Sequence, residues 1–92
     1  MSQQLARKWS ASKTQISTTV ENDTVILDTA SGKYFSLEGT GSVLWEALRE
    51  PRSFAELLET VQERYDVGAE TAERDVNALL SNLKEVGLVA NK

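Results

Sequence analysis

The 92-residue sequence contains neither cysteine nor histidine. These two absences exclude disulfide bonds, thiolate nucleophiles, the usual zinc ligands and the ordinary proton shuttle at neutral pH. The length allows one domain with one modest core, in which a deep enclosed active site would be difficult to build. Composition therefore favours binding over catalysis, and we expect neither an enzyme nor a bound cofactor.

Long apolar runs and an excess of positive charge are also lacking. The longest apolar stretches, such as residues 25–27, are far too short to cross a bilayer, and the first residues do not form a secretion signal. We therefore expect a cytoplasmic protein without a membrane partner. The formal net charge of -4 repels phosphate backbones, so nucleic acid is not an expected partner either.

Three short runs rich in β-branched and aromatic residues lie at residues 15–20, 24–28 and 33–37. The connections between them are too short for parallel crossovers and carry Asn, Asp, Ser and Gly, which favour tight reversals. The sequence thus predicts a three-stranded antiparallel meander. Residues 1–14 show no periodicity and are interpreted as a flexible arm, with docking of Trp9 on its own core or on a second copy as the alternative.

The sequence after the third strand is typical of helices. Thr40 is expected to cap the first helix, which must end before Pro51, and Trp45 on that helix is expected in the core or at its edge. Ser53 and Glu56 have the spacing of a capping box at the start of the second helix.

A third and longest helix is predicted over residues 69–86, with Gly87 placed to end it. The helical apolar stripes should cover one face of the sheet and form a single core with it. The expected fold is therefore α+β, with three antiparallel strands followed by three helices in one domain over residues 15–90.

The third predicted strand, residues 33–37, lies at an edge of the meander and leaves a row of unpaired backbone amides and carbonyls. It lacks proline and carries one charge, so it is weakly protected against pairing with another strand. Alternation places three side chains on one face and two on the other: Lys33, Phe35 and Leu37 against Tyr34 and Ser36. Core packing of Phe35 and Leu37 is the simpler interpretation, and it is compatible with a peptide-docking role.

The third predicted helix carries small and hydrogen-bonding side chains beside its apolar stripe. Asp75, Ala78 and Asn82 follow one flank, and Leu79 and Leu83 lie in the stripe next to them. A solvated face is the usual meaning of such residues, but they would also suit the wall and floor of a groove for an extended peptide. The carboxylate of Asp75 would favour a partner with basic residues.

Several short motifs occur in order along the chain: Leu27-Asp28, Ser31-Gly32-Lys33-Tyr34-Phe35-Ser36-Leu37, Gly41-Ser42-Val43-Leu44-Trp45, Asp75-Val76, Leu79-Leu80, Leu83 and Gly87-Leu88-Val89. In this order and spacing the sequence resembles the pyrroloquinoline quinone biosynthesis protein D family, also called the RiPP recognition element. RiPP denotes a ribosomally synthesised and post-translationally modified peptide. The resemblance covers about residues 16–89 and implies a winged helix-turn-helix-like fold that binds the leader segment of a precursor peptide.

The resemblance also implies where the leader binds, as a further strand beside the third strand and against the third helix. Carried over to this sequence, the implied contacts are Lys33, Tyr34, Phe35, Ser36, Leu37, Asp75, Ala78, Leu79, Asn82 and Leu83. The Tyr-Phe-x-Leu strand and the Gly-x-x-x-Trp helix look most like the stand-alone proteins of lasso-peptide biosynthesis. Their partner would be a separate leader peptidase.

Two alternatives compete with this interpretation. The protein could be a chaperone of the quinone-cofactor pathway or another RiPP pathway, delivering its precursor to a radical SAM enzyme, although residues 38–40 and 49–51 depart from the quinone branch. It could also be a DNA-binding winged helix, which the mostly acidic third helix disfavours. We expect a monomer, with a dimer that exchanges N-terminal arms as the other possibility.

Overall fold

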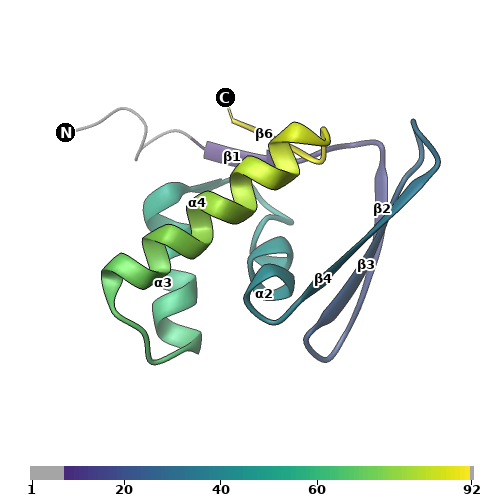
Figure 1. The fold of residues 1–92 in the computed structure, drawn as a ribbon. Helices are drawn as coiled ribbons and strands as arrows, with labels where there is room; N and C mark the ends of the chain where they lie inside the picture. Colours follow the sequence, from purple (N-terminus) through teal and green to yellow (C-terminus); the bar gives the residue numbers. More distant parts are fainter. Residues whose placement is uncertain (1–7, 92) are drawn as a thin grey trace.

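The computed structural model describes residues 8–91, shown as a ribbon in Figure 1. In chain order its elements are β1 (Lys8–Ala11), β2 (Gln15–Val20), β3 (Asp23–Asp28), β4 (Lys33–Glu38), α2 (Thr40–Ala47), β5 (Arg52–Ser53), α3 (Phe54–Arg64), α4 (Ala69–Glu85) and β6 (Val89–Asn91). The main sheet has the order β2-β3-β4 with antiparallel pairing throughout. This confirms the predicted α+β class, with a three-stranded meander followed by three helices.

A second small sheet, which the sequence did not predict, has the order β5-β1-β6. Trp9 of β1 pairs with Arg52 of β5 and Asn91 of β6, and its indole is buried with 9% of its surface exposed. The prediction of a flexible arm is therefore wrong for residues 8–11, where docking of Trp9 on its own core is observed. Residues 1–7 of that predicted arm lie outside the described residues.

The three helices begin and end largely where their capping residues require. The predicted capping box is present on α3, since the Ser53 N–H donates to Glu56 Oε1 over 2.8 Å and the Glu56 N–H donates to Ser53 Oγ over 3.1 Å. The predicted cap at Thr40 is wrong, because Thr40 is already helical and Gly39 occupies the cap with φ 54°. Glycine adopts this left-handed value without the clash that a Cβ would cause.

Helix α4 ends in a Schellman motif around Gly87, as the sequence predicted. Gly87 has φ 80°, and its N–H donates to the Lys84 carbonyl over 3.0 Å. The next N–H, that of Leu88, reaches back to the Leu83 carbonyl over 2.8 Å. These bonds satisfy carbonyls at the helix end and turn the chain directly into β6.

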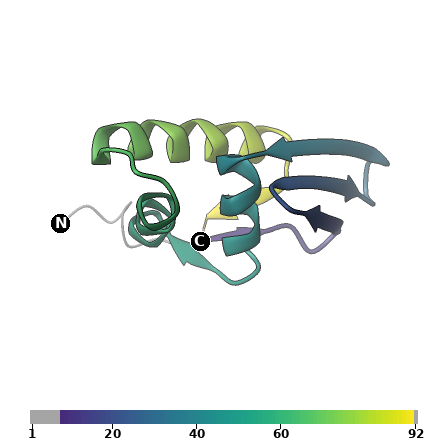
Figure 2. The same cartoon turned by 90° about the horizontal axis from the view of Figure 1, so that it is seen from below.

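The core lies between the inner face of the main sheet and the helices. Figure 2 shows α2 between the sheet and the pair formed by α3 and α4. Ile26 of the central strand and Leu44 and Trp45 of α2 are buried together, which confirms the expected place of Trp45. The opposite, outer face of the sheet has no helix over it in the described chain, so its apolar side chains stay exposed.

Candidate functional site

Among residues 8–91, strand β4 has a hydrogen-bonded neighbour on one side only, because it ends the sheet order β2-β3-β4. The Gly39 N–H, just beyond β4, donates to the Asn22 carbonyl over 2.9 Å, which identifies this pair as a hydrogen-bonded one. Hydrogen-bonded pairs alternate along an antiparallel ladder, so the odd-numbered residues of β4 bond to β3. The backbone N–H and C=O groups of Tyr34 and Ser36 therefore point to the open edge.

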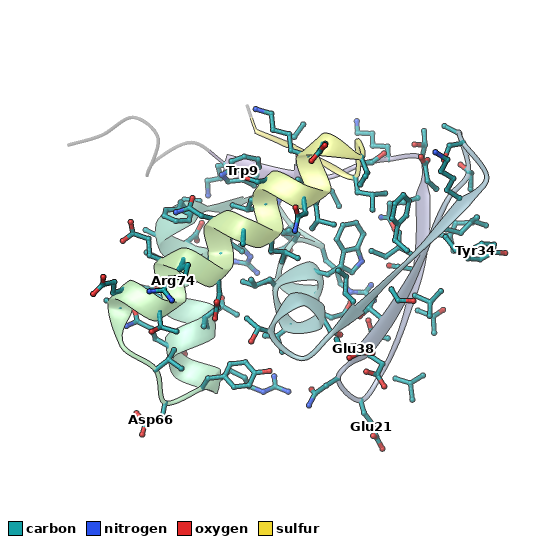
Figure 3. The ribbon with its side chains drawn as sticks, viewed as in Figure 1. Trp9, Glu21, Tyr34, Glu38, Asp66 and Arg74 are labelled. Atoms are coloured by element: carbon teal, nitrogen blue, oxygen red, sulfur yellow. The ribbon has the colours of Figure 1, made fainter. Side chains whose placement is uncertain are left out.

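The side chains of β4 divide between two environments, as alternation predicts. Phe35 and Leu37 are half-buried on the inner face and pack against the core. Tyr34 exposes 70% of its surface on the outer face, and Figure 3 shows its ring pointing away from the helices. Lys33 and Ser36 are exposed. A strand added at this edge would thus have one row of side chains toward the core side and another toward Tyr34.

Helix α4 approaches this edge, and α2 joins them at Gly41. A Cβ added at Gly41 would lie 3.5 Å from Leu79 Cδ1 and 3.6 Å from the side chain of Leu37. Leu37 of β4 and Leu79 of α4 therefore converge over a residue that has no side chain. This point is the root of the groove between β4 and α4.

The other predicted wall residues of α4 lie on the same flank as Leu79. Asp75, Ala78 and Asn82 are exposed, and helical spacing places them along one line with Leu79. Leu83 exposes only 4% of its surface and belongs to the core cluster, so it can offer little direct contact to a ligand. Nine of the ten predicted residues are therefore at least partly exposed, and the described contact between the two elements is that of Leu37 and Leu79 at Gly41.

A hollow of about 320 Å³ lies between β4 and the C-terminal end of α4. Its lining residues are Asp28, Ser31, Lys33, Phe35, Glu85 and Val86. Phe35 and Val86 form apolar surface, and Val86 exposes 41% of its surface, while Lys33 and Glu85 bring opposite charges. Sequence reasoning missed Val86 because it continues the apolar stripe of α4 and looks like a core residue. The sequence feature that could have identified Val86 as a site residue is its position one turn beyond Asn82, at the point where the helix ends.

Charge on the accessible side of α4 is mainly negative. This helix carries four exposed acidic residues, namely Glu70, Glu73, Asp75 and Glu85, and two exposed basic residues, namely Arg74 and Lys84. At the open edge itself, Lys33 supplies a positive charge near Glu85. A ligand that follows the Leu79 flank would meet the carboxylate of Asp75, and that of Glu85 at the end of the helix.

The titratable groups give no sign of acid–base chemistry at this edge. The pKa of Glu56 is lowered chiefly by the hydrogen bond from the Ser53 backbone N–H and also by the nearby ammonium of Lys8, against a smaller opposing effect of desolvation. This carboxylate caps α3 and lies on a different element from β4 and α4. Within residues 8–91, no three acidic side chains are grouped so that they could hold a metal ion. None of the described helices is long and apolar enough to span a membrane.

Two solved structures are similar to this chain over nearly its whole length. One is described as TbiB1 in complex with the TbiA(beta) leader peptide, with a TM-score of 0.81 and 29% identity, covering 87% of this chain and 93% of the other. The second, lasso peptide synthetase B1 complexed with the leader peptide, has a TM-score of 0.76 and 28% identity, covering 89% and 96% respectively. Comparison with curated protein sequences gives no significant match.

The family resemblance seen in the sequence motifs is confirmed by a family model. The model of coenzyme PQQ synthesis protein D (PqqD) matches residues 23–89, from the start of β3 to the first residue of β6. This range includes β4, α2 and α4, the three elements that form the groove. The chain belongs to the family of coenzyme PQQ synthesis protein D.

Proposed function

We propose that this protein binds the leader of a ribosomally synthesised precursor peptide of the lasso type, which adds as a strand to β4. The observation that carries the proposal is the open row of backbone groups at Tyr34 and Ser36 beside the groove of α4. The two similar structures are leader-peptide complexes, at 29% and 28% identity, which supports the same class of ligand here. Strand addition is a common way for a sheet edge to bind an extended peptide.

The main chain of β4 would supply affinity for the leader, and the side chains of the groove would supply the preference for particular leader residues. Main-chain hydrogen bonds to Tyr34 and Ser36 accept almost any leader sequence, because every residue except proline offers an N–H and a C=O. A leader side chain on the inner row would enter the hollow between Phe35 and Val86, which selects an apolar or aromatic residue. The carboxylates of Asp75 and Glu85 favour basic leader residues nearby. Ordering a flexible leader costs roughly 2–5 kcal/mol, so several such anchors are required.

The outer face of the sheet supports the second part of the proposal, presentation of the leader to a separate leader peptidase. Four apolar or aromatic side chains are exposed there, with Ile16 at 63%, Val20 at 66%, Val25 at 49% and Tyr34 at 70%. A sheet face of this kind normally packs against another layer, and a contiguous exposed apolar surface marks a protein contact. A peptidase docked on this face would lie next to a leader added at β4.

The test is a titration of the full chain with the leader encoded beside its gene, with a scrambled leader as the reference peptide. Ser36→Pro removes an N–H at the open edge while the ladder to β3 stays intact, so we expect binding at least tenfold weaker. Ser36→Ala is the matched control, since it removes the hydroxyl and keeps the N–H, and it should bind like the original protein. Equal affinity of Ser36→Pro and Ser36→Ala, both folded by circular dichroism, would rule out strand addition at β4.

A further inference from the structure

The main sheet has a second open edge, at β2. In the described part of the chain this strand is paired only with β3, and Figure 2 shows it on the side of the sheet away from α4. The Thr29 N–H donates to the Thr14 carbonyl over 2.7 Å, which identifies a hydrogen-bonded pair one step before β2 begins. By alternation the even-numbered residues of β2 bond to β3, and the backbone groups of Ser17 and Thr19 point outward.

Nothing in the sequence of β2 protects this edge from pairing. The strand reads Gln-Ile-Ser-Thr-Thr-Val, without charge or proline, and four of its six residues are β-branched. Edge strands are ordinarily protected by charged residues, proline or a bulge. Ile16 and Val20 also expose 63% and 66% of their surfaces on the outer face. In contrast, β4 carries charges at Lys33 and Glu38.

We propose that β2 is a pairing edge for a second copy of this chain. An antiparallel, two-fold arrangement about Thr18 would hydrogen-bond Ser17 of each copy with Thr19 of the other. It would also place Ile16 of each copy opposite Val20 of the other, in non-hydrogen-bonded positions where cross-strand side chains are closest. The same segment therefore supplies both halves of the contact, as an isologous interface requires.

Charged residues at the two ends of β2 favour a second copy of this chain over an unrelated strand as the pairing partner. Arg49 lines a hollow of about 300 Å³ together with Gln15 and Ser17, at the start of β2. Glu21 follows Val20 at the other end and is exposed. Antiparallel pairing would place Glu21 of one copy next to Arg49 of the other, and the two-fold axis would repeat this contact at the opposite end. Arg49 donates through Nε to Glu46 over 3.1 Å, which leaves its remaining guanidinium N–H groups for a second carboxylate.

One buried acceptor lies where the second copy would arrive. Gln15 Oε1 is enclosed but has no hydrogen-bond partner among the described residues, and its side chain lines the same hollow as Arg49. Buried polar atoms are nearly always paired, and a donor that arrives with the second copy would satisfy this acceptor. The hollow beside β2 is thus polar and charged, whereas the outer face of the strand is apolar.

The dimer would have one continuous sheet of six strands in the order β4-β3-β2-β2-β3-β4. Both β4 edges and both outer faces stay accessible, so the inference is independent of leader binding at β4. Pairing of one six-residue strand from each copy is a small contact, and stable interfaces normally bury roughly 1,200 Å² or more. We therefore expect a monomer–dimer equilibrium that depends on protein concentration.

Sedimentation velocity of the full chain across the micromolar range tests the proposal. The original protein should shift toward dimer as concentration rises. Thr18→Lys sets two ammonium groups opposite each other across the two-fold axis and should weaken association at least tenfold. Val25→Lys, on the same face but on the central strand, is the matched control and should dimerise normally. A protein that stays monomeric at every concentration, or a Thr18→Lys variant that dimerises normally, overturns the proposal.

A charge exchange tests the two-fold register independently. Glu21→Arg and Arg49→Glu should each weaken dimerisation several-fold. Each substitution gives residues 21 and 49 the same charge, so the two copies repel each other at both ends of the paired strands. The double variant restores opposite charges and should recover the original association; failure to recover it contradicts the register. Leader titration of Thr18→Lys should be unchanged, so a failed dimer and a failed leader site are distinguished by separate measurements.

Discussion

The indole N–H of Trp45 donates a hydrogen bond to Ser17 Oγ over 3.0 Å, which joins α2 to the inner face of β2. Trp45 exposes only 2% of its surface, so its N–H depends largely on this partner. We predict that Ser17→Ala lowers the free energy of unfolding by about 1–3 kcal/mol, the cost of an unsatisfied buried donor. Urea denaturation measures it, with Ser36→Ala on the exposed outer face as the control that should change little.

The burial of Trp9 gives a second prediction about stability. Truncation of a buried tryptophan typically costs about 3–5 kcal/mol, and Trp9 is 9% exposed in the core cluster. Trp9→Ala should therefore lower the free energy of unfolding by an amount of that order, although the sequence alone predicts a flexible arm in this region. Tyr34→Ala removes a ring that is 70% exposed and should have a small effect in the same denaturation experiment. Equal effects of the two variants would contradict the docked position of Trp9.

Most of the main fold was predictable because its signals are local. The three runs of β-branched residues, the Ser53–Glu56 capping box and Gly87 each act within a few residues, and each appears in the structure as expected. Strand β1 was not predictable in this way. Its four residues pair with Arg52–Ser53 and Val89–Asn91, so the strand exists only because the folded core brings three distant segments together.

The candidate site likewise has one part that local sequence signals predict and another part that depends on tertiary structure. Alternation alone assigned Phe35 and Leu37 to the inner face of β4 and Tyr34 to the outer face. The hollow that includes Val86 depends on where α4 ends relative to β4, which is a tertiary relationship without a local signal. The cap at Gly39 was missed for a related reason, since a preference of threonine for helix starts cannot show whether the chain needs a left-handed residue one position earlier.

The capping box predicts a specific pH dependence. Because hydrogen bonding to the Ser53 N–H lowers the pKa of Glu56 in the folded protein, the charged carboxylate stabilises the fold. This contribution is complete above the ordinary pKa of 4.5 and is lost as the pH falls through the lower folded-state pKa. Glu56→Gln keeps the capping geometry without a titrating group, so its unfolding free energy should fall less between neutral and acidic pH. An identical pH dependence of the two proteins in urea denaturation would exclude this role of Glu56.

The hollow between β4 and α4 supplies a prediction about the leader site, which depends on the proposed function. Val86→Asp places a carboxylate next to Phe35 and Glu85, where an apolar leader side chain would have to displace its water. We expect leader affinity to fall at least tenfold, with little loss of stability because Val86 is already 41% exposed. Val20→Asp makes the same substitution at a more exposed valine on β2, at the far edge of the sheet, and should bind leader normally. Fluorescence anisotropy with a labelled leader measures both, and equal affinities would show that the hollow does not contact the peptide.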